Sequence, residues 1–323
     1  MSAPHVVLHG GFHKTATSHI QSVLSRNAKA LARQGVVYVP HRDIRKEVTV
    51  PCQLRVYEQL GRDYRTKYTE AELAARTGAF FGGLARKEPR RVILSEENMA
   101  GHCGHCVKRG LLYVWREQMI AAFAAQIPWP VREVHLGVRN YADFFASAYV
   151  EYLRSLKSGP FTDPREMRRQ VLAHMPDWAK ALGSVRRAFP DARLIVWPYE
   201  RFRQIDVAVL QNLCGEGVEA ESLTPPGERN KRPTASGRAV HELVQMIHRD
   251  GVEAAVAQRV KIQKGYPRGH KHGGWDPWTV QERAHLTRIY ARDLAAISAD
   301  PDIEVLGEGA GAPSLSAWQP SEA

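Results

Sequence analysis

The chain has 323 residues, of which 44% are hydrophobic and 24% charged, and its formal net charge is +11. This composition is typical of globular proteins and excludes a chain that is disordered throughout, while the lack of any run of about 18 uncharged apolar residues excludes a membrane span. The apolar run Val6-Val7-Leu8 is too short for the hydrophobic part of a signal peptide, so we expect a cytoplasmic protein whose 4 cysteines are reduced. The positive charge favours an anionic partner, which can be a nucleic acid, another polyanion or a small phosphorylated molecule.

Predicted strands and helices alternate over the first two-thirds of the chain. Short apolar runs predict strands at residues 5–9, 36–39, 91–94, 131–138 and 193–197. Apolar residues at helical spacing predict helices at residues 15–34, 111–126 and through 144–153, and a helical region at 234–299 that is interrupted by a loop at 264–275. This alternation predicts a three-layer α/β/α fold with a mostly parallel central sheet. We expect a single α/β domain over residues 1–300 and a flexible tail over residues 301–323.

The loop after the first predicted strand has the composition of an anion site. It reads Gly10-Gly11-Phe12-His13-Lys14-Thr15-Ala16-Thr17-Ser18. Glycines let the backbone approach a phosphate, the N–H groups at the start of a helix favour an anion, and Lys14 adds a full positive charge. The alternative is a plain turn in which Thr15 or Thr17 only caps the helix. A nucleoside-triphosphate loop, G-x-x-x-x-G-K-[ST], is disfavoured because His13 stands where that pattern requires glycine.

Part of this loop resembles the 5′-phosphosulfate-binding loop of the sulfotransferase family. That loop reads lysine, a small residue, glycine, threonine and threonine at the start of the first helix. Here the matching segment is Lys14-Thr15-Ala16-Thr17-Ser18. Ala16 replaces the usual glycine and Ser18 replaces the second threonine, while the lysine and the hydroxyl groups are kept.

A second resemblance to sulfotransferases follows the predicted strand at residues 131–138. The family has an arginine after a central strand and a serine eight residues later, and together they hold the 3′-phosphate of the donor nucleotide. Arg139 and Ser147 have this spacing, although Tyr141 replaces a frequent proline. An arginine can bind a dianionic phosphate through two hydrogen bonds, which agrees with this role. The alternative for Arg139 alone is a solvated residue at the end of a strand.

A third resemblance lies at the end of the strand at residues 91–94. Bacterial and carbohydrate-type sulfotransferases often have Ser-Ser-Glu there, and the glutamate can be the catalytic base. Here the segment reads Ser95-Glu96-Glu97-Asn98, and its alignment favours Glu97 as the base over Glu96. Two adjacent carboxylates could divide the work, one titrating and the other bridging to a lysine. His102 is a further candidate base, and a helix N-cap at Ser95 is the structural alternative.

The resemblance implies a sulfotransferase that uses 3′-phosphoadenosine 5′-phosphosulfate and releases adenosine 3′,5′-bisphosphate. It implies that Lys14 stabilises the charge on the bridging and departing oxygens. It also implies that residues 14–18 hold the 5′-phosphosulfate, that Arg139 and Ser147 hold the 3′-phosphate, and that Glu97 removes a proton from an acceptor hydroxyl or amine. Transfer by in-line displacement needs alignment and fixed positive charge, so no metal is expected.

Two further segments have the composition of possible sites. The cluster His102-Cys103-Gly104-His105-Cys106 could be a metal site, a redox pair or a loop on the acceptor side, but it lacks a second ligand pair at zinc-site spacing. The loop at residues 264–275 is rich in glycine, lysine and histidine, and it could be a cationic lid over the donor or an anionic acceptor, or a solvated loop. It belongs to the segment 229–275, which has 10 Lys and Arg against 3 acids.

Two other functions stay open at this point. A nucleotide or small-molecule kinase shares the strand, loop and helix arrangement, and a non-catalytic protein could bind a polyanion. No nucleic-acid-binding motif is present, so nucleic acid is not the expected partner. The acceptor can be a carbohydrate or another small molecule, and the positive charge of the segment 229–275 favours an anionic one; the sequence does not indicate the oligomeric state.

Overall fold

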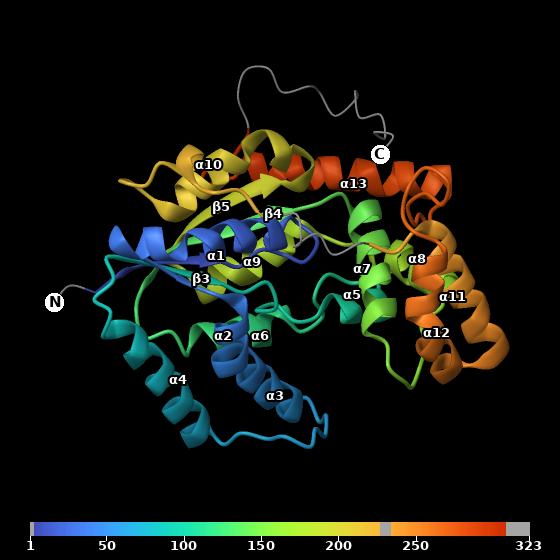
Figure 1. Ribbon diagram of the computed structural model, residues 1–323, viewed down its shortest axis with the longest axis horizontal. Helices are drawn as coiled ribbons and strands as arrows, with labels where there is room; N and C mark the ends of the chain where they lie inside the picture. The colour runs from blue at the N-terminus through green and yellow to red at the C-terminus, as the bar shows by residue number, and fades with distance from the viewer. Residues whose placement is uncertain (1–2, 227–233, 308–323) are drawn as a thin grey trace.

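The computed structural model describes residues 3–226 and 234–307, and it contains one parallel sheet of six strands (Figure 1). The strands follow the order β2-β3-β1-β4-β5-β6. They are β1 (His5–His9), β2 (Val36–Val39), β3 (Arg91–Ser95), β4 (Val131–Val138), β5 (Arg193–Pro198) and β6 (Ile303–Val305). Because β1 lies between β3 and β4, the loop after β1 meets the carboxyl ends of both neighbours, which is where ligands bind in such sheets.

Helices cover both faces of the sheet, so the predicted three-layer α/β/α fold is confirmed. Within β1, Val6 and Leu8 belong to the same apolar core as Trp178, whereas Val7 belongs to the core on the other face with Ile20. The alternation follows from the two-residue period of a strand, and burial on both faces is typical of parallel sheets.

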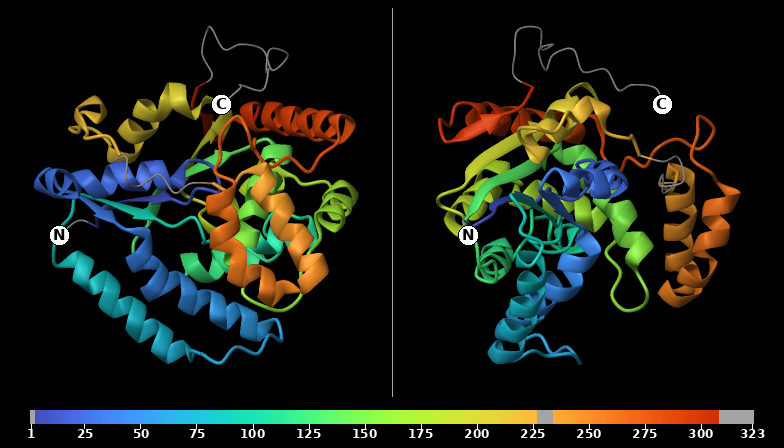
Figure 2. Two further views of the ribbon diagram at one scale, coloured as in Figure 1. Left: turned by 45° about the vertical axis from the view of Figure 1, so that its right-hand side comes forward. Right: turned by 60° about the vertical axis from the view of Figure 1, so that its left-hand side comes forward.

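The helices connect the strands and add two outlying groups. They are α1 (Thr17–Arg33), α2 (His41–Ile44), the π-helical segment η1 (Arg45–Thr49), α3 (Val50–Gln59), α4 (Glu70–Ala85), α5 (Cys103–Arg109), α6 (Arg116–Ala124), α7 (Tyr141–Ser155), α8 (Pro164–His174), α9 (Trp178–Ala188), η2 (Tyr199–Arg201), α10 (Phe202–Cys214), η3 (Ala220–Ser222), α11 (Gly237–Asp250), α12 (Val252–Gly265) and α13 (Val280–Ser298). Figures 1 and 2 show α3 and α4 extending from one side of the sheet, and α11 and α12 lying side by side at the end near α7 and α8. In the described part of the chain, no helix is both long and apolar enough to cross a bilayer.

Two predicted boundaries were wrong. The helix predicted at residues 111–126 begins only at Arg116, because Gly110 ends α5 in a left-handed conformation and Tyr113 has a φ of 48° in the turn that follows. The tail predicted from residue 301 contains β6, which pairs with β5 through Leu194 and Ile303. The remainder of that tail, residues 308–323, lies outside the described residues.

Candidate active site

The loop between β1 and α1 forms a cradle of backbone N–H groups. Lys14 and Ala16 have left-handed φ angles of 67° and 68°, and Thr15 between them does not. Alternation of this kind turns successive N–H groups toward one side and creates an anion-binding concavity. Among the described residues, no group accepts a hydrogen bond from the N–H groups of residues 14–18. The β4 strand approaches the loop closely at Gly137, where an added Cβ would lie 2.7 Å from Thr15 Cβ.

The ammonium group of Lys14 lies at this cradle beside an acidic residue of α7. Its Nζ is 3.6 Å from Oε2 of Glu151, and the two side chains are 26% and 27% exposed. Glu151 also pairs with Arg154 on the same helix. Burial would raise the pKa of Glu151, but its hydrogen bond to Arg154 and the charge of Lys14 lower it. Lys14 therefore faces a charged carboxylate that an incoming anion would have to replace.

The hydroxyl groups of the loop are placed differently from one another. Thr15 is fully buried, and its Oγ1 donates to the carbonyl oxygen of Phe12 at 2.5 Å. Thr17 is buried at the start of α1, and Ser18 is exposed. Thr15 can therefore bind an anion through its backbone N–H, whereas its hydroxyl group stabilises the loop itself.

His13 ties the loop to the other side of the site. Its backbone N–H donates to the hydroxyl oxygen of Tyr113 at 2.9 Å, and its Nδ1 lies 3.1 Å from the same oxygen. Oδ1 of Asn98 can only accept, so Nε2 carries the ring proton and donates it there at 2.5 Å. In the neutral ring Nδ1 is then the acceptor, and the Tyr113 hydroxyl donates to it. Burial lowers the pKa of His13 to about 4, so the ring is neutral at pH 7.

Arg139 lies at the end of β4 and contacts the same loop. Its Nη1 donates to the carbonyl oxygen of Lys14 at 2.8 Å, and its guanidinium carbon lies 4.2 Å from the ring centroid of Tyr199. Its Nε is buried and has no partner among the described residues. Ser147 is half-buried on α7, one helical turn before Glu151, so both residues face the same side of that helix. The structure therefore brings Arg139 directly to the loop and places Ser147 on the helix that contacts Lys14.

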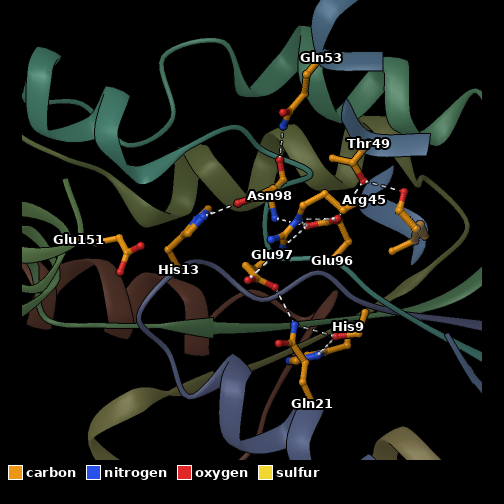
Figure 3. A network of polar contacts seen from close by, with 12 residues as sticks. His9, His13, Gln21, Arg45, Thr49, Gln53, Glu96, Glu97, Asn98 and Glu151 are labelled. Carbon is orange, nitrogen blue, oxygen red and sulfur yellow. Dashed lines mark hydrogen bonds and ion pairs between the residues drawn. The ribbon is translucent and has the colours of Figure 1, made fainter. Parts of the chain in front are cut away.

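Two carboxylates follow β3 and share one cation (Figure 3). Nη2 of Arg45 lies 2.8 Å from Oε1 of Glu96 and 3.1 Å from Oε1 of Glu97. Glu96 also accepts a hydrogen bond from Oγ1 of Thr49 at 3.0 Å. Glu97 accepts one from Nε2 of Gln21 at 2.6 Å. The predicted bridge from one of these carboxylates to a lysine is wrong: the cation is Arg45 of the π-helical segment, and it contacts both carboxylates.

The two carboxylates differ in access and in acidity. The side chain of Glu96 is 0% exposed and that of Glu97 is 16% exposed. Complete burial raises the pKa of Glu96, although the charge of Arg45 opposes this. Burial would also raise the pKa of Glu97, but Arg45 and Gln21 lower it to about 2. Of the two, only Glu97 is accessible from the surface, and it is charged at neutral pH.

His102 lies on the same side of the site, and burial of its ring, followed by the charge of Arg45, lowers its pKa from the usual histidine value. The ring of His105 on α5 lies edge-on to that of His102, with centroids 6.3 Å apart.

Sequence reasoning missed three residues of this site. Arg45 belongs to the connection between β2 and β3, and no pattern at its own position distinguishes it from other surface arginines. Gln21 lies one turn inside α1, so the helical spacing could have placed it under the end of β3. The sequence pattern identifies His13 only as the replacement of a glycine, whereas both of its ring nitrogens make specific contacts.

The cysteines of the 102–106 cluster are buried thiols. Burial raises the pKa of Cys103 to about 12 and that of Cys106 still further, so neither is a reactive thiolate. Sγ of Cys106 accepts a hydrogen bond from the backbone N–H of Tyr113 at 3.2 Å. Within residues 3–226 and 234–307, no group of three or more His, Cys, Asp or Glu side chains is arranged to hold a metal ion.

The basic loop at residues 264–275 is tied to its surroundings. Oγ of Ser236, which caps α11, donates to the carbonyl oxygen of Tyr266 at 2.7 Å, and the N–H of Gly237 donates to the carbonyl oxygen of Gly273 at 3.1 Å. The ring of Trp275 stacks on Tyr149 of α7, with centroids 5.8 Å apart. The loop is thus anchored to α7 and to the start of α11; residues 229–233 of the basic segment lie outside the described residues.

No protein-family model and no curated protein matches the chain. Among solved structures, the chain is similar to a sulfotransferase from Alicyclobacillus acidocaldarius, with 12% sequence identity and a TM-score of 0.38. The similarity covers 82% of this chain and 96% of that one. A likeness at this level assigns neither a family nor an activity.

Proposed function

We propose that the protein transfers a sulfuryl group from 3′-phosphoadenosine 5′-phosphosulfate to a hydroxyl or amine of an acceptor. The observation that carries the proposal is the N–H cradle at residues 14–18 together with Arg139, whose guanidinium contacts the same loop and keeps a buried Nε without a partner among the described residues. Buried donors are nearly always paired in folded proteins, so anions at these two places would complete the site. The donor, when bound, supplies the sulfuryl group and a bisphosphate leaving group.

The loop after β1 is proposed to hold the 5′-phosphosulfate. The N–H groups of Lys14, Thr15, Ala16, Thr17 and Ser18 would donate to its oxygens, and the dipole of α1 would favour the negative charge. Lys14 would leave Glu151 and stabilise the charge that develops on the oxygen between sulfur and phosphorus. Fixed positive charge of this kind lowers the barrier without any reorganisation during the reaction.

Arg139 and Ser147 are proposed to hold the 3′-phosphate. The unpaired Nε of Arg139 supports this role, because a phosphate oxygen could accept its hydrogen bond. A 3′-phosphate distinguishes this donor from ATP, which carries its phosphates on the 5′ side only. The proposal therefore predicts selectivity as well as binding.

Glu97 is proposed to accept the acceptor's proton. Its exposure favours it over Glu96, whose two oxygens are enclosed by donors. A carboxylate with a low pKa is a weak base, but the acceptor proton becomes strongly acidic as the new oxygen–sulfur bond forms. Glu97 can therefore orient the acceptor first and take its proton late.

The test is donor turnover by the wild-type protein and by Lys14→Ala. With a sulfur-labelled donor and a panel of carbohydrates, lipid head groups and hydroxylated metabolites, the wild-type protein should transfer label to an acceptor. Lys14→Ala should lose transfer while its circular dichroism stays unchanged, and Lys29→Ala, which removes an exposed lysine of α1, should keep it. Near-normal transfer by Lys14→Ala would refute the assigned role.

Two other functions, a kinase and a non-catalytic polyanion binder, are tested by parallel assays. Magnesium-dependent transfer of a labelled γ-phosphate from ATP would favour the kinase. Salt-dependent binding to a sulfated glycan without donor binding would favour the polyanion binder.

A further inference from the structure

Arg45 connects the two carboxylates at the end of β3, and this contact extends the function proposed above. It starts the π-helical segment η1, which joins α2 to α3. Thr49 ends the same segment, and both side chains point to Glu96 (Figure 3). Segments of π-helix are rare and occur often at functional sites, and this one presents two hydrogen-bond donors to a single buried carboxylate.

Glu96 fixes the position of Arg45. Its Oε1 accepts hydrogen bonds from Nη2 of Arg45 at 2.8 Å and from the backbone N–H of Asn98 at 2.8 Å. Its Oε2 accepts one from Thr49 at 3.0 Å, and Nε of Arg45 lies 3.2 Å from both oxygens. A fully buried carboxylate with this many donors has no room for a substrate, so its contribution to the site passes through Arg45.

Arg45 in turn holds one oxygen of Glu97, and Gln21 holds the other. The distances are 3.1 Å from Nη2 of Arg45 to Oε1 and 2.6 Å from Nε2 of Gln21 to Oε2. Two contacts on two different oxygens fix both the position and the rotation of the carboxylate. The other titratable groups that act on Glu97 come from β1, the loop, β2 and the turn before α6: His9, His13, Tyr38 and Tyr113. Both histidines are neutral at pH 7 and both tyrosines are protonated, so Arg45 is the main positive charge that faces Glu97.

We propose that Arg45 is a positioning residue, which the buried Glu96 anchors and which keeps Glu97 charged and aimed at the acceptor. The inference rests on the proposed function. In the transfer step, the acceptor oxygen forms a bond to sulfur while the bond from sulfur to the bridging phosphate oxygen breaks. The electron pair of the broken bond goes to the departing bisphosphate, and the acceptor proton goes to a carboxylate oxygen of Glu97.

The test compares Arg45→Gln with Arg45→Lys. Arg45→Gln removes the charge, so the pKa of Glu97 should rise by about 1 to 3. The apparent pKa of the acid limb in the pH profile of kcat/KM should rise by the same amount. Arg45→Lys keeps a positive charge but not the fork that contacts both carboxylates. Its acid limb should therefore stay near that of the wild type while kcat falls about tenfold or more.

The matched control is Arg168→Gln. Arg168 makes a similar two-bond pair with Glu282, and its side chain is also 28% exposed, but it lies on α8 away from the loop. This variant should leave the acid limb and kcat unchanged. Circular dichroism and the affinity for adenosine 3′,5′-bisphosphate should stay within twofold of wild type in all three variants.

Carboxyl carbon NMR separates this inference from the proposed function. With side-chain-labelled glutamate and Glu97→Gln for assignment, the Glu97 signal should not titrate above pH 4 in the wild type, and in Arg45→Gln it should titrate about 1 to 3 pH units higher than in the wild type, with a midpoint between about pH 3 and 5. An unchanged titration would overturn the inference even if the protein is a sulfotransferase. A shifted titration in a protein that transfers no sulfuryl group would keep the role of Arg45 toward Glu97 and remove the proposed function. If Arg45→Gln does not fold, Arg45→Lys decides. A kcat that falls about tenfold or more supports the positioning role, and a kcat equal to that of the wild type overturns it.

Discussion

The neutral state of His13 predicts how acid destabilises the protein. His13→Gln keeps a group that can donate to Asn98 but cannot take up a proton. In the wild type, burial lowers the pKa of His13 from 6.5 to about 4. The unfolded chain therefore binds a proton at this position at a higher pH than the folded chain does. The stability that depends on neutral His13 is present above about pH 6.5 and is lost as the pH falls toward 4.

The size of the effect follows from these two pKa values. Between pH 7.5 and pH 5, the difference in proton binding at His13 removes about 2 kcal/mol from the free energy of unfolding. His13→Gln should also lose the contact of Nδ1 with Tyr113, which costs about 1 kcal/mol at every pH. The variant should thus be slightly less stable than wild type at pH 7.5, and its disadvantage should disappear or reverse by pH 5.

Urea unfolding at several pH values between 5 and 7.5 measures this difference directly. His241→Gln is the control, because His241 is exposed on α11. Its stability should follow the wild type across the whole range. Equal slopes of stability against pH in wild type and His13→Gln would refute the conclusion that His13 is held neutral by burial in the loop.

Two further substitutions test the loop's backbone. Ala16→Gly should raise the free energy of unfolding by about 1 kcal/mol, because Ala16 has a φ of 68° that glycine adopts without strain. Ala28→Gly, within α1, should lower it by about 1 kcal/mol. Thermal unfolding would contradict this if both variants changed stability in the same direction. Gly137→Ala should lower the free energy of unfolding by about 1 to 3 kcal/mol and weaken anion binding, because its Cβ would lie 2.7 Å from Thr15 Cβ. Gly78→Ala, with no atom within 4 Å of its Cβ, should be tolerated. An unchanged anion affinity in Gly137→Ala would show that the loop does not depend on this close approach.

The sheet and the anion loop could be predicted because their signals are local. The strands β1, β2 and β4 are largely buried and rich in valine and leucine, and their predicted bounds agree with the structure. Strand ends in a parallel sheet meet at one edge, which is why Lys14 and Arg139 could be expected near each other; they are in contact through a 2.8 Å hydrogen bond.

The missed parts depend on contacts between distant segments. Arg45 reaches Glu96 across 51 positions of the chain, and only the π-helical segment brings it there. The strand β6 has only 3 residues, and its pairing with β5 is what stabilises it. No local pattern encodes either contact, because each depends on the fold around it.

The most direct test of the proposed function is a calorimetric titration of the wild-type protein with adenosine 3′,5′-bisphosphate and with ATP. We expect the bisphosphate to bind at least about tenfold more tightly than ATP, since a charged hydrogen bond from Arg139 to the 3′-phosphate is worth about 1.5 to 3 kcal/mol. Arg139→Ala should remove this preference, and Arg132→Ala, which removes an exposed arginine of β4, should keep it. Tighter binding of ATP, or no binding of the bisphosphate, would contradict the account.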